Sequence, residues 1–406
     1  MWEIVVFNGI SLLALPTSLL SLFLWLGLWF WRGNFWRLDW QIEKEPRANR
    51  PLFSYPPICA VIPARNEAAT LPQTLRSLCQ QDYPGPFTII IVDDGSTDGT
   101  ADAARSLLEQ IPSPPPVKII TANPLPAGWT GKLWALQQGI DTAETQTPTP
   151  EYFLLTDADI QHDAASLRRL VAKAKGENLD LLSVMVKLRC KSFWERLLIP
   201  AFVFFFQKIY PFAWVNHPNR STAAAAGGCS LLRRQAYHRI GKLAAIRQAL
   251  IDDCSLAKVV KDSSQPSSGI WLGLSTSTHS LRVYSSLADI WHMVARTAFA
   301  QLNYSPWLLL GTIAGMLLVY IVPVAAIVWG IWLQNWQVAV TGLVTWLLMA
   351  KLYYPTVRFY QQLPIWSFAL PAIAFFYTLM TLDSAWRHWR GKGGWWKGRV
   401  YRQTSQ

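Results

Sequence analysis

The chain has 406 residues, of which 51% are hydrophobic and only 15% are charged, and its formal net charge is +12. Soluble domains usually carry roughly 25% charged residues, so the composition argues against a wholly soluble protein. The positive balance suits an anionic membrane surface or phosphate-bearing substrates. We expect no nucleic-acid partner, because no basic cluster is interleaved with aromatic residues on a soluble module.

Residues 4–31 form a long apolar run without Lys or Arg, and Arg32 and Arg37 follow it. A spanning helix needs about 20 apolar residues, whereas a cleaved signal peptide has a shorter apolar region after a basic start. We therefore predict an uncleaved transmembrane anchor over residues 1–32. The positive-inside rule then predicts that the next domain lies in the cytoplasm. We expect an integral protein of a bacterial-type inner or plasma membrane.

Residues 57–287 have the composition of a soluble α/β domain. Apolar strands are expected at 56–64, 86–96 and 152–160, and they are not alternating in polarity. Helices are expected at 67–81, with an apolar face at Leu71, Leu75 and Leu78, and at 98–110, capped by Asp98 or Thr100. Strands without alternation, separated by helices, predict a mainly parallel sheet covered on both faces.

The last third of the chain is again apolar. We expect an interfacial helix over 288–305, a C-terminal transmembrane region over 306–386 and a basic aromatic tail over 387–406. Three spans in this region would leave the basic tail outside, against the positive-inside rule, whereas two would keep it inside. Both alternatives stay open. The candidate spans are 308–332, 338–352 and 365–386.

A further apolar run at 197–214 interrupts the soluble domain. If it crossed the membrane once, Asp157 and Asp253 would lie on opposite sides. The run is therefore expected to be an interfacial or re-entrant segment if those two residues share a site. A buried core helix is the other interpretation. The five cysteines show no CxxC pair and are expected to be reduced thiols.

Polar clusters follow the three expected strands, at 62–67, 93–100 and 156–160. Ligands of open parallel sheets bind outside the carboxyl ends of the strands, so the three clusters suggest one shared crevice. On extended backbone, Asp157 and Asp159 would project from the same side and crowd two charges together. Aspartates also commonly end strands and begin turns. A Mg²⁺ or Mn²⁺ ion held by this pair would let an acidic crevice accept a diphosphate.

The segments "PARNE", "DDGSTD" and "DAD", in that order and spacing, resemble the family 2 glycosyltransferases, which have the GT-A fold. The resemblance covers roughly residues 57–287, and it implies a nucleotide-sugar donor. "GWTGKLWALQQG" is similar to the GKxxAL element of that family. The resemblance implies a nucleotide pocket lined by Pro63, Arg65 and Glu67, uracil contact by Asp94 with Asp93 close by, Lys132 near the donor, Asp157 near the donor ribose or sugar, and Asp159 as a metal ligand.

"IDDCSLAKVVK" looks like the ED motif of the same family, with Asp252 in place of the glutamate and Asp253 as the catalytic base. Asp253 could instead cap the helix that follows it. The small residues of 223–234 allow close backbone approach to donor or acceptor. The QxxRW motif of processive members is absent. Arg296 is a candidate for neutralising the leaving diphosphate, although a solvated interfacial arginine explains it equally well.

The expected function is that of a membrane glycosyltransferase that transfers a sugar, with inversion and metal dependence, from a UDP-sugar to a lipid hydroxyl. The N-terminal anchor, "DAD", "IDDCSLAK", "VARTAFAQL" and the "WKGRVY" tail together resemble most the hopanoid-biosynthesis-associated members of the family. A processive polysaccharide synthase is one alternative, disfavoured by the missing QxxRW motif and the few C-terminal spans. A non-catalytic membrane scaffold is another, disfavoured by intact Asp157, Asp159 and Asp253.

Overall fold

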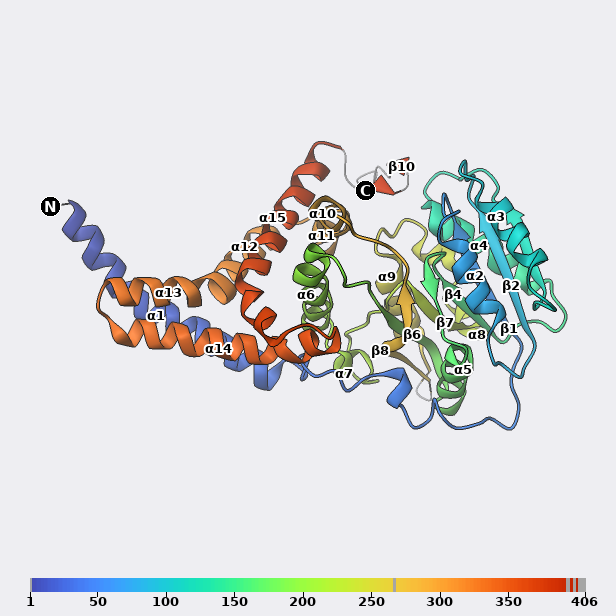
Figure 1. The fold of residues 1–406 in the computed structure, drawn as a ribbon, viewed down its shortest axis with the longest axis horizontal. Helices are drawn as coiled ribbons and strands as arrows, with labels where there is room; N and C mark the ends of the chain where they lie inside the picture. Colours follow the sequence, from blue (N-terminus) through green and yellow to red (C-terminus); the bar gives the residue numbers. More distant parts are fainter. Residues whose placement is uncertain (1, 266–267, 392–394, 397–398, 401–406) are drawn as a thin grey trace. The chain divides into compact units, whose positions relative to one another are not determined.

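The computed structural model describes residues 2–265, 268–391, 395–396 and 399–400, and the chain divides into two compact units (Figure 1). We call them the sheet unit and the helical unit. The sheet unit consists mainly of Asp39–Arg189 and Phe212–Val283. The helical unit consists of Met1–Leu38, Cys190–Pro211 and Tyr284–Trp395.

One half of the sheet unit is a parallel sheet with the strand order β3-β2-β1-β4. All three strands expected from the apolar runs are present in it. Strand β3 was not predicted, because its residues are only partly buried and carry no long apolar run. The strands are β1 (Ile58–Ala64), β2 (Phe87–Asp93), β3 (Val117–Thr121) and β4 (Tyr152–Thr156).

Helices cover both faces of this parallel half, as predicted. Ile58, Ala60 and Ile62 of β1 share a buried core with residues of α2 and α5. Helix α4 packs against β1 and β2 through Gly139, where an added Cβ would lie 2.3 Å from Val61 Cγ1. Covered faces explain why the strands are apolar throughout. The helices are α2 (Leu71–Cys79), α3 (Thr100–Glu109), α4 (Gly131–Glu144) and α5 (Ser166–Gly176).

The predicted details of α2 and α3 have different outcomes. Leu71, Leu75 and Leu78 of α2 are buried, so its predicted apolar face is confirmed. The predicted cap of α3 is wrong, because Gly99, with φ 82°, stands at the N-cap. Asp98 instead accepts hydrogen bonds from the backbone N–H groups of Ala68 and Thr100.

The other half of the sheet continues in the order β4-β7-β6-β8-β5 and is mixed. Strand β7 runs antiparallel to both β4 and β6, β6 pairs in parallel with β8, and β5 is antiparallel to β8. The chain leaves the sheet unit after β6 and returns to it before β7. These strands are β5 (Ile160–Gln161), β6 (Leu179–Lys187), β7 (Cys229–Arg233) and β8 (Gly269–Ser280).

The sheet unit begins at Asp39, before the expected domain start at 57. The segment ahead of β1 is attached to β8, since the Leu274 N–H donates to the Trp40 carbonyl and Glu43 accepts hydrogen bonds from residues of β8. Short helices complete the unit: η1 (Ile42–Lys44), α7 (Phe212–Val215), α8 (Arg234–Arg239), η2 (Leu243–Ile246) and α9 (Asp252–Ser263).

In the described part of the chain, five helical segments are long and apolar enough to cross a membrane, judged by length and composition. All four runs expected to span are among them, and three of these follow residue 306. The five are Leu13–Trp31, Phe193–Val215, Pro306–Trp332, Trp336–Phe359 and Pro364–Trp389.

Within the helical unit, α1, α13 and α14 pack together (Figure 1). Small residues allow the close approach of α13 and α14, since a Cβ on Gly342 would lie 2.5 Å from the Pro323 carbonyl oxygen. The elements are α1 (Trp2–Trp31), α6 (Phe193–Ile209), α10 (Leu287–Ala295), α11 (Ala298–Gln301), α12 (Pro306–Met316), η3 (Leu317–Ile321), α13 (Val322–Trp332), α14 (Trp336–Phe359), η4 (Pro364–Ala369) and α15 (Leu370–Trp389).

The apolar run at 197–214 forms most of α6 and the short α7. Helix α6 begins with a capping box of Ser192 and Glu195, and Leu198 and Phe204 are fully buried in the helical unit. The Tyr377 hydroxyl of α15 donates to the Leu198 carbonyl. Along the chain, α6 lies between the two main segments of the sheet unit. The chain leaves that unit before α6 and returns to it afterwards.

Two expectations near the C-terminus also differ in detail. The interfacial helix expected over 288–305 is divided into α10 and α11, because the chain leaves helical geometry at Thr297. The expected tail over 387–406 begins as the last turn of α15. Residues 392–394, 397–398 and 401–406 of that tail lie outside the described residues. The two short strands β9 (Trp395–Trp396) and β10 (Arg399–Val400) lie within it.

Candidate active site

The polar clusters after β1, β2 and β4 lie at one edge of the sheet. These strands are parallel neighbours, so their carboxyl ends meet, and Ala64 pairs in register with Asp93. The Asp94 N–H donates to the Ala64 carbonyl at 2.8 Å. The Asp157 N–H donates to the carbonyl of Gly228, just before β7, at 3.3 Å. The shared crevice expected from the sequence is therefore bounded on its far side by the mixed half of the sheet.

The loops after β1 and β2 are joined by polar contacts. Arg65 lies 3.8 Å from the carboxylate of Asp94 and also donates to the Asp94 carbonyl. Asp94 is 4% exposed, so its charge is balanced inside the protein. Asp93 has a different role, because its Oδ1 accepts the N–H of Ser96 and holds the turn of its own loop. Glu67 is attached to the same structure through its N–H, which donates to Thr100 Oγ1.

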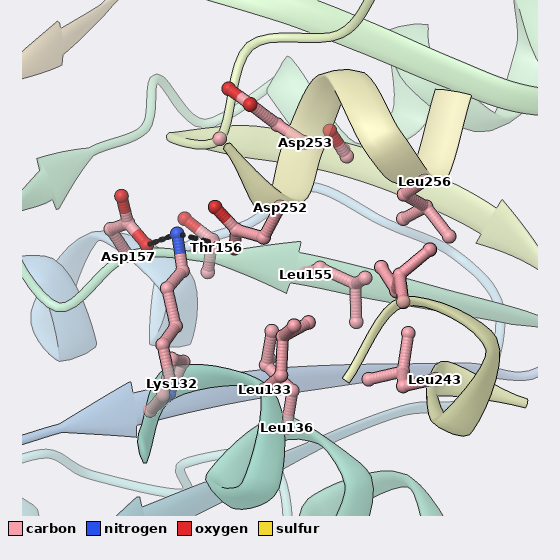
Figure 2. A pocket seen from close by; sticks show the side chains of 14 residues that line it. Lys132, Leu133, Leu136, Leu155, Thr156, Asp157, Leu243, Asp252, Asp253 and Leu256 are labelled. Atoms are coloured by element: carbon pink, nitrogen blue, oxygen red, sulfur yellow. Dashed lines mark ion pairs between the residues drawn. The ribbon is translucent and has the colours of Figure 1, made fainter. Parts of the chain in front are cut away.

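A pocket open to solvent lies beside this edge (Figure 2). Lys132 extends into it and meets two carboxylates, Asp157 Oδ1 at 2.9 Å and Asp252 Oδ2 at 3.4 Å. Asp253 and Pro63 also line the pocket. Its other wall is aliphatic, which keeps water from that side of the charged cluster. The aliphatic lining consists of Leu133, Leu136, Leu155, Leu243, Ile246 and Leu256.

Two helix starts supply these charged side chains. Lys132 is the second residue of α4, and Asp252 and Asp253 are the first two residues of α9. Each of these three residues is thus both a helix-start residue and a residue that lines the pocket. Asp253 is not the N-cap, because Ile251 stands there, and its Oδ1 accepts the Cys254 N–H at 2.8 Å. The helix N-terminus favours negative charge at both aspartates.

The surroundings of Asp253 adjust its proton affinity. Burial and the neighbouring Asp252 raise the pKa of Asp253 to about 6, against the opposing effects of Lys132 and two backbone N–H groups. Burial disfavours the charge of Lys132, but Asp157 and Asp252 outweigh it and raise the lysine pKa above its ordinary value. Lys132 is therefore a cation at neutral pH, and the pKa of Asp253 lies in a range that suits a group exchanging a proton near neutral pH.

Gly227 completes this part of the site. A Cβ at this position would lie 3.2 Å from Lys132 Nζ and 3.4 Å from Asp253 Oδ2. The backbone of the segment 223–228 thus passes directly beside the two charged groups. The sequence interpretation of this small-residue segment as one of close backbone approach fits this arrangement.

Asp159 lies apart from Lys132. Strand β4 ends at Thr156, and the residues 157–159 lead through a turn into β5, so the expected extended backbone for the aspartate pair is wrong. Arg282 Nε lies 3.0 Å from Asp159 Oδ2. The crowding of two charges is relieved by two separate cations, Lys132 at Asp157 and Arg282 at Asp159. Burial and then Asp157 raise the pKa of Asp159 to about 6, opposed by Arg282.

A buried hydrogen-bond chain supports the turn from behind. Thr156 Oγ1 donates to the Gly228 carbonyl at 3.0 Å and lies 3.0 Å from His162 Nε2. Burial lowers the pKa of His162 to about 4, so the ring is neutral and Nε2–H donates to the threonine. The His162 N–H is bound by Ser77 Oγ. This chain connects β4 to the segment before β7.

Arg296 belongs to the helical unit, where it is the exposed C-cap residue of α10. It is not among the residues that line the pocket of the sheet unit. Its role at the leaving diphosphate stays a prediction. The five cysteines all lie in the described part of the chain and are free thiols, as expected.

The acidic side chains fit a metal that is shared with a ligand. Among the described residues, no group of three or more His, Cys, Asp or Glu side chains could hold a metal ion alone. Mg²⁺ typically uses one or two carboxylates and takes its other ligands from substrate phosphates and water. Asp157 and Asp159 supply two carboxylates. Burial and the charge of Asp157 raise the pKa of Asp159, and a bound cation would favour its ionised form.

The fold and the site agree with the GT-A fold that the sequence resemblance predicts. An α/β sheet carries acidic loops at the carboxyl ends of its parallel strands, and two carboxylates at the start of α9 lie in the pocket beside them. Residues 59–241, somewhat less than half of the chain, match the model of the family described as Glycosyl transferase family 2.

Curated relatives have lipid-directed names. The chain is 29% identical over 203 residues to beta-monoglucosyldiacylglycerol synthase of Synechocystis sp., covering 46% of this chain and 40% of the relative. It is 26% identical over 225 residues to 4,4'-diaponeurosporenoate glycosyltransferase of Staphylococcus aureus, covering 53% of this chain and 54% of the relative. The chain thus spans about half the length of the curated relatives that it matches.

One solved structure is similar over nearly the full length of both chains. It is the mannosyltransferase PcManGT from Pyrobaculum calidifontis, solved in complex with GDP-Man and Mn²⁺. The TM-score is 0.52 at 17% sequence identity, with 92% of this chain and 99% of the other covered. At this identity, the likeness shows a shared fold.

Proposed function

We propose that this protein is a membrane glycosyltransferase that transfers a sugar from a nucleotide-sugar donor to a hydroxyl group of a lipid. The observation that carries the proposal is the pocket in which Asp253, Lys132 and Asp157 meet at the carboxyl ends of the strands. The family 2 domain over residues 59–241 supports the same reaction class.

The donor would bind along the edge formed by the loops after β1 and β2. Pro63, Arg65 and Glu67 would line the nucleotide pocket. Asp94 would contact the nucleobase, and Asp93 would hold the turn of its own loop. We expect a uridine nucleotide, as the family resemblance implies. Lys132 is a permanent cation in the pocket and would attract the negatively charged donor.

Asp253 would act as the general base of an inverting displacement. Its carboxylate takes the proton of the acceptor hydroxyl, while the acceptor oxygen forms a bond to the anomeric carbon. The bond between that carbon and the phosphate oxygen breaks, and its electron pair leaves with the nucleoside diphosphate. A pKa of about 6 leaves Asp253 mostly ionised near neutral pH and still basic enough to accept a proton.

Asp159, together with Asp157, would hold a Mg²⁺ or Mn²⁺ ion. When bound, the ion supplies positive charge to the diphosphate of the donor. Asp157 already contacts Lys132, so the two carboxylates would divide their roles. Asp159 would face the metal, and Asp157 would orient Lys132 and the sugar.

The lipid acceptor and the location follow from the helical unit. Five apolar segments of spanning length fit an integral membrane protein. The curated relatives are named beta-monoglucosyldiacylglycerol synthase and 4,4'-diaponeurosporenoate glycosyltransferase, which supports a lipid acceptor. A membrane-embedded enzyme meets an apolar acceptor in two dimensions. We propose that the sheet unit faces the cytoplasm, because Arg32 and Arg37 follow the first apolar run. A hopanoid or related lipid is the acceptor class that the sequence resemblance favours.

The test is UDP release by the purified protein with Mn²⁺ or Mg²⁺, a panel of UDP-sugars, and bacterial lipid extract present or absent. We expect release that needs lipid and that falls by about 10²–10⁴-fold in Asp253→Asn. Asp262→Asn is the matched control, because Asp262 is an exposed residue on the same helix that pairs with Lys258. Unchanged turnover in Asp253→Asn would contradict the proposed base. A long polymer product would favour a processive synthase instead.

A further inference from the structure

Arg282 follows β8 and bridges two acidic residues of the site. Its Nε lies 3.0 Å from Asp159 Oδ2, and its NH2 group lies 3.5 Å from Glu67 Oε1. The side chains of Asp159 and Glu67 are 12% and 13% exposed, whereas that of Arg282 is 41% exposed. The two carboxylates are therefore fixed inside the protein, and the arginine reaches them from the solvent side.

The backbone holds Arg282 beside Asp159. Ile160 pairs with Ser280 in the ladder between β5 and β8, and the Leu281 N–H donates to the Asp159 carbonyl at 2.7 Å. The Arg282 N–H contacts Ser280 Oγ at 3.3 Å. The main chain at Arg282 is thus bound to the turn that carries Asp159, and a change of partner would need only its side chain to rotate.

Arg282 and a divalent cation would need the same carboxylate. Asp159 Oδ2 accepts the guanidinium, and a cation bound to that oxygen would lie against a positive charge at close range. Cation binding at Asp159 therefore favours release of the guanidinium. Because its main chain stays attached, the released group remains near whatever the cation holds. An arginine fork matches the oxygens of a phosphate better than any other side chain does.

We propose that Arg282 is a counter-ion that changes partner. Before a donor binds, Arg282 neutralises Asp159 and Glu67. When a divalent cation enters with a nucleoside diphosphate, the cation replaces it on Asp159 and Arg282 pairs with the diphosphate. This inference rests on the proposed function, since it assumes a cation and a diphosphate at the same carboxylates. This exchange makes binding of the two ligands cooperative. The cation releases Arg282 to the diphosphate, and the diphosphate draws Arg282 away from the carboxylate that the cation binds.

The experiment measures Mn²⁺ binding to the full-length protein by the electron paramagnetic resonance signal of free Mn²⁺, and UDP binding by calorimetry. Without nucleotide, Arg282→Ala should bind Mn²⁺ tighter than wild type, because the competing cation is gone. With saturating Mn²⁺, the same variant should bind UDP more weakly. We expect each change to be about 5–150-fold, the usual range of coupling between two ligands.

Two further variants separate this exchange from a structural role. Arg282→Lys keeps the charge but loses the fork, so it should retain the Mn²⁺ affinity of wild type while losing UDP affinity; it also serves if the alanine variant does not fold. Arg168→Ala is the matched control, because Arg168 makes a similar two-bond contact with Asp82 on other elements. This control should change neither affinity.

The outcomes distinguish the inference from the function on which it rests. If wild type binds UDP with Mn²⁺ but Arg282→Ala binds Mn²⁺ no tighter without nucleotide, the exchange is overturned and the proposed function stands. If wild type binds no UDP even at saturating Mn²⁺, the proposed donor site and the exchange both fail.

Discussion

The two halves of the sheet differ in how they contribute to the site. The parallel half, β3-β2-β1-β4, ends in loops whose residues are adjacent in sequence to the strands that place them. The mixed half supplies Gly227, Asp253 and Arg282 from segments that meet only through β7 and β8. In our proposal the parallel half binds the donor, and the mixed half provides the base and the movable cation. The chemistry thus depends on the contact between the halves, and variants at that contact test it.

Apart from the proposed base itself, the largest effect is expected at Lys132, which joins the halves through Asp157 on one side and Asp252 on the other. Lys132→Met leaves Asp157 and Asp252 without their shared cation, so kcat/KM should fall by at least about 30-fold, the equivalent of 2 kcal/mol. UDP-release kinetics would measure this change. Lys258→Met on the surface of α9 is the control, and it should behave as wild type. Equal activity of the two variants would show that Lys132 is not part of the site.

A smaller effect, on stability, is expected at Thr156. Thr156→Val removes the hydroxyl that joins His162 to the Gly228 carbonyl across the two halves. Two buried polar groups lose a partner, so the free energy of unfolding should fall by about 1–3 kcal/mol. Urea unfolding of the detergent-purified protein checks this value. Thr149→Val at an exposed position should leave stability unchanged, and an equal loss there would argue against the buried chain.

The smallest effect is expected at Gly227. The added methyl of Gly227→Ala meets Lys132 Nζ at 3.2 Å and Asp253 Oδ2 at 3.4 Å, so the lysine ammonium must shift by a few tenths of an ångström beside the carboxylate. Because misplacement by 1 Å can cost about 10²-fold, this shift should lower kcat by roughly 2–10-fold. Gly269→Ala is the matched control, since nothing lies within 4 Å of a Cβ there. A Gly227 variant with full activity would show that the segment tolerates a side chain.

The sequence predicted the parallel half well because its signals are local. Uninterrupted apolar runs gave β1, β2 and β4, and the polar residues directly after them had to lie at one sheet edge. Lys132 and Asp253 were also placed in the site, through segments that resemble family motifs. Their positions in one pocket agree with that placement.

The strand pairing of the mixed half could not be predicted from the sequence, because its contacts join residues that are far apart along the chain. Strand β7 pairs with β4 and β6 only after the chain has passed through the helical unit, and no periodicity records that return. Arg282 meets Asp159 across 123 positions and stands in a segment without a motif. The aspartate pair was expected on extended backbone, but residues 157–159 lead through a turn from β4 into the two-residue strand β5.

The central claim is that Asp253, adjusted by Lys132 from the opposite half, accepts the acceptor proton. The most direct test is the pH dependence of kcat/KM for the lipid, at saturating donor and Mn²⁺, in wild type and Lys132→Met. The folded-state pKa of Asp253 is raised to about 6, so the carboxylate is protonated and inactive below that pH. We predict that wild-type kcat/KM falls about tenfold per pH unit below pH 6, and that the break moves to higher pH in the variant, because Lys132 lowers this pKa. A wild-type profile that stays flat to pH 5, or a break that Lys132→Met leaves in place, would contradict the account.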